Sequence, residues 1–210
     1  VQSMAVTVNP VTKEFVAEIG DIDLAKPVSS SDLVVIKESF THYAILIFPD
    51  QRLTQEQHIE FAKNFGPLEI SISTFRKDDP KRMSMELANV SNLGADEKPL
   101  PNNSRIRGMQ KANLLWHTDS SFKDVPALAS LLYARSIPPV GGLTEFADMR
   151  AAYEALSNEI KLSLKGLVAE HSYLHSRSKI GFTQFTKAER KNLPPALQVL
   201  VRTGPESGRT

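Results

Sequence analysis

The chain has 210 residues, 41% of them hydrophobic, which is enough for one sizeable core and few for two independent domains. Lysine and arginine number 25 against 24 aspartates and glutamates, and this formal charge of +1 gives no reason to expect nucleic acid or an anionic membrane as a partner. Cysteine is absent, which excludes disulfides, thiolate metal sites and thiol nucleophiles and leaves His, Asp and Glu as the strong metal ligands.

The N-terminal residues carry no sign of a membrane or secretory segment. They lack a basic stretch followed by a long apolar run, and no part of the chain approaches the roughly 20 apolar residues of a membrane span. We therefore expect a cytoplasmic protein with one domain over residues 1–210. The three residues before Met4 are left out of the fold prediction.

Short strands and a helix are expected first. Apolar residues over 6–19 stand among Gly, Asp and Pro, which predicts strands that end near Gly20. Apolar residues then recur at helical spacing over 33–40 and predict a helix that ends near Tyr43. Three residues could cap the start of this helix: Ser30, Ser31 and Asp32.

A strand and a second helix follow. Residues 44–48 are apolar without alternation, which predicts a central strand covered on both faces. Thr54 and Gln57 have the spacing of a capping box, so a helix should begin there and end at Gly66.

Residues 71–111 lose this periodicity and are rich in Pro, Asn, Gly and mixed charge, apart from a candidate strand at 85–91. A segment of this length inside a domain is typical of a lid or a disordered loop. Arg105, Arg107 and Lys111 at its end could clamp an anionic substrate, and a solvated basic loop is the alternative.

The second half of the chain predicts mainly β-structure with two short helices. The strand-like runs are 114–122, 127–137, 143–146 and 167–173. Asp148 can cap a helix through Leu156, and Ser157 can cap another to about Lys165. Early helices followed by many short strands favour an α+β or barrel-like fold over a doubly wound sheet.

His117 and Asp119 are the candidate metal ligands. Two residues apart on a strand, they would point to the same face and could bind one metal ion. A His-x-Asp pair with a distant second His is the facial triad of non-haem iron oxygenases, which leaves three coordination positions open. A hydrogen-bonded His–Asp pair at the end of a strand is the alternative.

The residues around this pair carry a resemblance to a known family. The stretch 113–122 resembles the taurine and dichlorophenoxyacetate dioxygenase family. Further matches, in the same order and spacing, cover nearly the whole chain: 20–24, 43–51, 53–57, 65–69, 141–146 and 171–173.

The resemblance implies a fold, cofactors and site residues. The implied fold is α+β, a double-stranded β-helix (jelly-roll, cupin-like) with flanking N-terminal helices, incomplete at the C-terminus. The implied cofactors are Fe(II), 2-oxoglutarate as cosubstrate and O2, with His117 and Asp119 as iron ligands. Thr144 would donate its hydroxyl to 2-oxoglutarate, and Asn113 would contact a small anionic organic substrate. Without the resemblance, Asn113 would be read as an ordinary polar residue at the start of a strand. Thr144 would be read as an ordinary strand residue after a Gly-Gly turn.

The family's distal His ligand and its 2-oxoglutarate-binding Arg have no match in these residues, so we expect the sequence to belong to a longer protein. A homo-oligomer is also expected. His42 and His58 are expected to be surface or capping residues on helices. His171 and His175 lie in a segment that reads as β-structure and are expected to be structural or to support the site indirectly. Trp116 and Phe122 are expected to pack as core or rim.

The resemblance finally suggests a reaction. Where taurine-specific relatives carry His and Tyr, this chain has Ser71 and Thr74, and the runs around His117 and Thr144 are closer to the phenoxyalkanoate branch. We therefore expect an oxidoreductase of aromatic compound degradation that cleaves a phenoxyacetate-type ether to a phenol and a 2-oxo acid, releasing succinate and CO2. The alternatives are a sulfonate or sulfate-ester dioxygenase of the same family, a non-catalytic truncated relative, and a β-barrel that binds another divalent metal.

Overall fold

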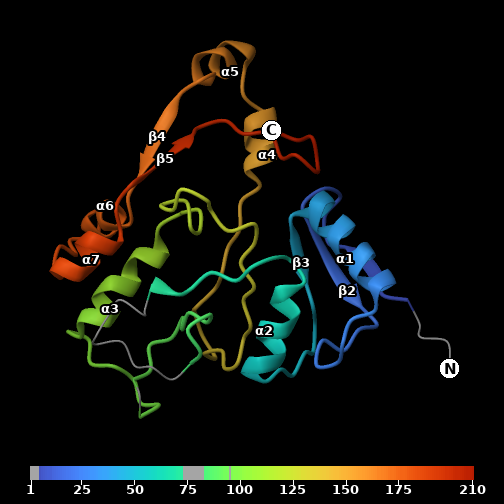
Figure 1. Ribbon diagram of the computed structural model, residues 1–210, viewed down its shortest axis with the longest axis horizontal. Helices are drawn as coiled ribbons and strands as arrows, with labels where there is room; N and C mark the ends of the chain where they lie inside the picture. Colours follow the sequence, from blue (N-terminus) through green and yellow to red (C-terminus); the bar gives the residue numbers. More distant parts are fainter. Residues whose placement is uncertain (1–4, 73–82, 95) are drawn as a thin grey trace. The chain divides into compact units, whose positions relative to one another are not determined.

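The computed structural model describes residues 5–72, 83–94 and 96–210 and divides them between two units, each considered by itself (Figure 1). The first unit takes the residues up to 66 together with 131–167 and 200–210, and the second takes 67–130 and 168–199. Single-domain organisation over 1–210 stays a prediction.

The elements of the first unit are β1 (Thr7–Pro10), β2 (Val16–Gly20), α1 (Ser30–Tyr43), β3 (Ile45–Ile47), α2 (Gln55–Lys63), α4 (Met149–Glu154) and α5 (Asn158–Leu164). Those of the second are α3 (Arg105–Gln110), the 3₁₀ helix η2 (Lys111–Leu114), β4 (Val168–His171), α6 (Tyr173–Ser178), α7 (Lys187–Asn192) and β5 (Ala196–Val199). Each unit therefore mixes helices and strands, as the sequence predicts.

The sheet of the first unit has the order β1-β2-β3, with β1 antiparallel and β3 parallel to β2. The strands predicted before Gly20 are confirmed. The strand predicted at 44–48 is present as β3, but the prediction that it is central is wrong, because β2 occupies the middle of the sheet and β3 pairs on one side in the described structure. Ile47 is accordingly 44% exposed.

Helix α1 covers this sheet and closes the core of the first unit (Figure 1). Ser29 caps α1 by accepting a hydrogen bond from the Asp32 backbone amide, one residue before the candidates chosen from sequence. Ile36 is fully buried against Val6 and Ile19. The capping box of Thr54 at the start of α2 is confirmed.

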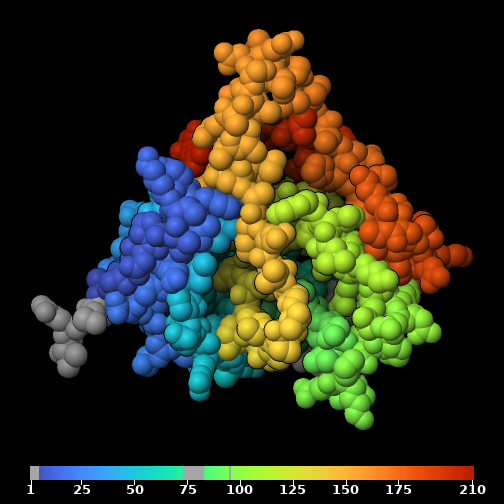
Figure 2. All heavy atoms as spheres, turned by 180° about the vertical axis from the view of Figure 1, so that it is seen from behind, coloured from blue at the N-terminus to red at the C-terminus, as the bar shows by residue number. Residues whose placement is uncertain are grey.

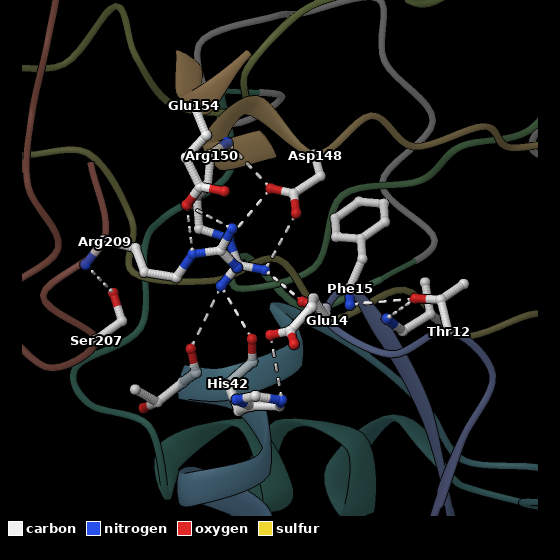
Figure 3. Close-up of polar contacts among 11 residues, drawn as sticks. Thr12, Glu14, Phe15, His42, Asp148, Arg150, Glu154, Ser207 and Arg209 are labelled. Carbon is white, nitrogen blue, oxygen red and sulfur yellow. Dashed lines mark hydrogen bonds and ion pairs between the residues drawn. The ribbon is translucent and has the colours of Figure 1, made fainter. Parts of the chain in front are cut away.

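Arg150 ties the start of α4 to the rest of the first unit (Figure 3). Its guanidinium donates to the carbonyl oxygens of His42 at 3.0 Å and Glu14 at 3.0 Å, and its Nε donates to Asp148 Oδ1 at 3.1 Å. Burial raises the pKa of the Asp148 carboxyl, but the hydrogen bonds from Arg150 outweigh this and lower the pKa overall. Asp148 also caps α4, so both predicted helices, α4 and α5, are confirmed with their caps.

A buried ion pair joins two helices of the second unit. Arg105 on α3 donates from Nη2 to Glu189 Oε2 on α7 at 2.7 Å, and Glu189 is 2% exposed. Glu189 also completes a capping box with Thr186 at the start of α7. In Figure 2 the light green surface around α3 correspondingly lies against the orange-red surface of α6 and α7.

Several predicted strands are absent from the described part of the chain. Residues 85–91, 115–122, 127–137 and 143–146 have no strand pairing, and residues 111–114 form η2 instead. These runs have strand-like composition, but a strand also needs a neighbour that takes up its backbone N–H and C=O groups. Within 71–111, helix α3 replaces the irregular structure expected there.

No helix in the described ranges is both long and apolar enough to cross a membrane.

Candidate metal-binding site

The side chains of His117 and Asp119 face each other just before a turn of the chain. The chain leaves η2 in an extended conformation at Leu115, and the Lys123 amide then donates to the Ser120 carbonyl at 3.0 Å to close a turn. Ser120 adopts a φ of 56°, in the left-handed region. The strand predicted to align His117 and Asp119 is not formed, yet their side chains are in contact.

The hydrogen bond made by His117 Nδ1 determines whether Nε2, on the other side of the ring, donates or accepts. His117 Nδ1 lies 2.7 Å from the Leu115 carbonyl oxygen, and because a carbonyl can only accept, Nδ1 carries the hydrogen. In the neutral ring Nε2 is then an acceptor, and it faces Asp119 Oδ1 at 3.3 Å. Two acceptors at this distance repel each other unless a proton or a cation lies between them.

The second carboxylate oxygen of Asp119 is held from the other side. Ser130 Oγ donates to Asp119 Oδ2 at 2.8 Å, which leaves Oδ1 directed at His117. The side chains of His117 and Asp119 are 46% and 60% exposed, so the pair is open to solvent and to a ligand.

The spacing of the two atoms suits a shared metal ion. Ligands about 2.1 Å from a metal and at right angles to each other are roughly 3 Å apart, close to the 3.3 Å found here. A ligating His with its other nitrogen bonded to a carbonyl is also the usual outer arrangement of such sites. Among the described residues no group of three His, Cys, Asp or Glu side chains gathers around one point.

The turn is anchored by residues that the sequence did not single out. Glu69 accepts from Ser120 Oγ at 2.8 Å and pairs with Lys123 Nζ at 2.9 Å. Gln198 on β5 donates to the Lys123 carbonyl at 2.7 Å. Glu69 lies in the matched stretch 65–69, which is the one signal that pointed to it, whereas Ser130 and Gln198 carried none.

The other predicted site residues make no hydrogen bond or ion pair with this pair among the described residues. Asn113 is exposed on η2, four residues before His117, and its Oδ1 accepts from Arg177 Nη2 at 3.3 Å. Thr144 is exposed in an irregular segment of the first unit, whereas His117 and Asp119 belong to the second.

The basic residues considered as a substrate clamp are held by the protein. Arg105 binds Glu189, and Arg107 Nη1 donates to the Leu100 carbonyl at 3.1 Å. The Arg105 guanidinium is therefore engaged within the protein, and neither the substrate clamp nor the solvated loop predicted for it is found. Lys111 is exposed.

The remaining histidines differ from the sequence expectation in two places. His58 is half-buried on α2 with its ring 5.8 Å from that of Tyr133, rather than on the surface. Burial, and then the charge of Arg135, lower the pKa of His58. His175 lies on α6, where β-structure was predicted, and His42 ends α1 as expected. Of the two residues compared with taurine-specific relatives, Thr74 lies outside the described residues.

The chain matches one family model and several curated relatives over almost its full length. The model described as "Taurine catabolism dioxygenase TauD, TfdA family" matches residues 7–210. An alpha-ketoglutarate-dependent 2,4-dichlorophenoxyacetate dioxygenase of Cupriavidus pinatubonensis is 41% identical over 206 residues, which are 98% of this chain and 72% of that protein. An (S)-phenoxypropionate/alpha-ketoglutarate-dioxygenase of Sphingobium herbicidovorans is 35% identical over 215 residues, covering 99% of this chain and 69% of that protein.

A solved structure supports the same relationship. The crystal structure of AAD-2 in complex with Mn(II) and N-oxalylglycine superposes with a TM-score of 0.87 and 42% identity, covering 98% of this chain and 70% of that one.

Proposed function

The chain belongs to the taurine catabolism dioxygenase TauD, TfdA family, whose relatives reported above are 2-oxoglutarate-dependent dioxygenases, and from this premise we propose that it cleaves the ether bond of an aryloxyalkanoate. The enzyme is an oxidoreductase that uses Fe(II), 2-oxoglutarate and O2. The proposed substrate is a small anionic compound of the phenoxyacetate type.

His117 and Asp119 are proposed as two of the protein ligands of the iron. The observation that carries this proposal is the contact of His117 Nε2 with Asp119 Oδ1, because two facing acceptors 3.3 Å apart fit a bound cation. A second His from outside the described residues is proposed to complete the facial set of three.

When bound, the iron and 2-oxoglutarate supply the oxidising chemistry that takes a hydrogen atom from an unreactive carbon. The chain's own residues orient and hold the groups around it. The Leu115 carbonyl keeps the His117 Nε2 lone pair free, and Ser130 aims Asp119 Oδ1 at the same point. Thr144 is proposed to donate its hydroxyl to a carboxylate of 2-oxoglutarate, and Asn113 to contact the substrate.

The proposed reaction balances as follows. One oxygen atom of O2 enters succinate as 2-oxoglutarate loses CO2, and the other hydroxylates the carbon beside the ether oxygen. The resulting hemiacetal breaks its carbon–oxygen bond to the aryl ether oxygen, which leaves as a phenol. The hydroxylated carbon becomes the carbonyl of a 2-oxo acid.

The proposal extends to the complete fold, the oligomeric state and the location of the enzyme. We propose that these residues contribute to a double-stranded β-helix, supported by the TM-score of 0.87 to the AAD-2 structure. Large apolar side chains are exposed along the irregular segment 125–146, which supports an association that covers them, and a homo-oligomer is proposed: Val125, Leu128, Leu132, Ile137, Val140, Leu143 and Phe146. A cytoplasmic location is proposed from the sequence.

A coupled assay tests the substrate. The purified protein is incubated with Fe(II), 2-oxoglutarate and O2, and succinate is measured with and without 2,4-dichlorophenoxyacetate. We expect the phenoxyacetate to stimulate succinate formation with an equal yield of 2,4-dichlorophenol. Stimulation by taurine or an alkyl sulfate but not by phenoxyacetates would sink the aryloxyalkanoate proposal while leaving the enzyme class standing.

A further inference from the structure

Helix α6 contacts both ends of the segment that carries His117 and Asp119. Tyr173 is 5% exposed, and its ring packs edge-on against that of Phe122 at 5.2 Å, three residues after Asp119. One turn further along α6, Arg177 donates to Asn113, four residues before His117. Residues of α6 therefore lie beside the candidate metal site within the same unit.

The Arg177 guanidinium is held rigidly but is not neutralised. Its Cζ lies 4.3 Å above the Tyr173 ring, and Nη1 donates to Ser176 Oγ at 3.2 Å. Its Nε is buried, and among the described residues it has no hydrogen-bond partner. A buried donor in this state is costly unless a ligand or solvent satisfies it.

Three other partly buried arginines in the described structure are paired with carboxylates, whereas Arg107 is bonded to the Leu100 carbonyl. Arg105 binds Glu189 at 2.7 Å, Arg150 binds Asp148 at 3.1 Å and Arg209 binds Glu154 at 2.7 Å. The described residues provide no carboxylate to Arg177 within ion-pair distance. Arg177 therefore presents an uncompensated positive charge beside Asn113, four residues before His117.

The contact with Arg177 also determines which way the Asn113 amide points. A guanidinium has only donors, so the Asn113 atom that it contacts must be the oxygen, and the Nδ2 hydrogens are directed elsewhere. No described residue accepts a hydrogen bond from this exposed Nδ2. A carboxylate that received it would lie next to the Arg177 charge.

We propose that Arg177 and Asn113 together recognise the carboxylate of the organic substrate, with Arg177 providing the charge and the orientation and Asn113 providing a neutral donor. This inference rests on the proposed function. A carboxylate of 2-oxoglutarate would satisfy the same two groups chemically, so the experiment has to separate the two sources. The substrate is favoured because Asn113 is the residue already proposed to contact it.

The test measures, by calorimetry, the equilibrium binding of two matched probes to the metal-free protein. The probes are 2,4-dichlorophenoxyacetate and the neutral 2,4-dichlorophenoxyethanol, which has an alcohol in place of the carboxylate. We expect Arg177→Met to weaken binding of the acid by at least about tenfold and that of the alcohol by less than about twofold, because a hydrogen bond to a charged group is lost only with the acid. Arg177→Lys should restore part of the loss.

Two further variants separate charge recognition from a structural effect. Arg190→Met is the matched control, because Arg190 also stacks on an aromatic ring, Phe185 at 5.6 Å, and lies in the same unit without contacting Asn113. It should leave binding of the acid unchanged. Asn113→Asp keeps an acceptor for Arg177 but neutralises its charge, so it should weaken binding of the acid at least as much as Arg177→Met.

The outcomes that overturn the inference are distinct. Equal weakening of the acid and the alcohol by Arg177→Met would mean that Arg177 only supports the fold. Weaker binding of N-oxalylglycine with unchanged binding of the acid would assign the charge to the 2-oxoglutarate carboxylate. If wild-type protein forms succinate in response to phenoxyacetate while Arg177→Met binds the acid normally, this inference fails and the proposed function stands. Binding of neither probe by wild type would overturn both.

Discussion

Ser130 Oγ is the contact that keeps Asp119 aimed at His117. It donates to Oδ2 at 2.8 Å, from eleven residues along the chain. We predict that Ser130→Ala weakens Fe(II) affinity by about tenfold, the low end of the effect of removing such an outer partner of a ligand. Ser178→Ala is the control, because that hydroxyl also donates to a protein acceptor in the same unit, without touching Asp119. Equal metal affinities for wild type and Ser130→Ala would show that Asp119 needs no support.

His58 should make the stability of the protein depend on pH. Because burial lowers its pKa, the unfolded chain binds a proton more readily than the folded protein does. Its contribution is therefore fully present above the unfolded value of about 6.5 and is lost as the pH falls through the folded pKa. Melting temperatures of wild type and His58→Gln between pH 7.5 and pH 5 check this. The variant should show the shallower decline, and parallel curves would contradict the assignment.

Among the secondary-structure elements, α3 and α7 depend on one buried ion pair. Glu189 is 2% exposed, and Arg105→Met would leave its charge buried without a partner. We predict a loss of about 3 kcal/mol in the free energy of unfolding, the lower value for breaking a buried pair, since Arg105 itself is 22% exposed. Urea unfolding of the variant beside Arg190→Met measures it, and a loss no larger than that of the control would refute the role of the pair.

The same pair has a definite dependence on pH. Burial raises the pKa of Glu189, but the hydrogen bonds from Arg105 and the Thr186 backbone lower it overall. A carboxyl with a lowered folded pKa stabilises the protein above its unfolded pKa of about 4.3, and this is lost as the pH falls through the folded value. The acid-induced loss of stability should therefore be smaller in Arg105→Met than in wild type.

Helices could be predicted where the local signal is complete. The caps at Thr54, Asp148 and Ser157 lie within four residues of the amides they serve, and all three helices form. The capping box from Thr186 to Glu189 has the same spacing as that of Thr54 and Gln57, but the helix α7 that it begins is not among those predicted from the sequence. Strands were overpredicted because their partners lie far along the chain, and composition does not show whether a partner is present.

The candidate site could be predicted in part. The choice of His117 and Asp119 as a pair agrees with their 3.3 Å contact, although the strand expected to align them is not formed. Their supports are remote in sequence: Glu69 is 51 positions from Ser120 and Arg177 is 64 from Asn113. Tertiary contacts at such separations have no local pattern, so only the structure reveals them.

For the whole molecule, His117 and Asp119 lie in the second unit and Thr144 lies in the first. The family model matches residues 7–210, which include residues of both units. We propose above all that His117 and Asp119 hold the iron to which 2-oxoglutarate binds.

Anaerobic addition of 2-oxoglutarate to the Fe(II)-loaded protein tests this claim most directly, through the metal-to-ligand charge-transfer absorption of the chelate. Wild type should develop the band, and His117→Gln and Asp119→Asn should each require at least about tenfold more Fe(II) to do so. The matched controls His175→Gln and Asp124→Asn replace exposed residues of the same unit and should behave as wild type. A band of wild-type strength at wild-type Fe(II) concentration in either ligand variant would contradict the account.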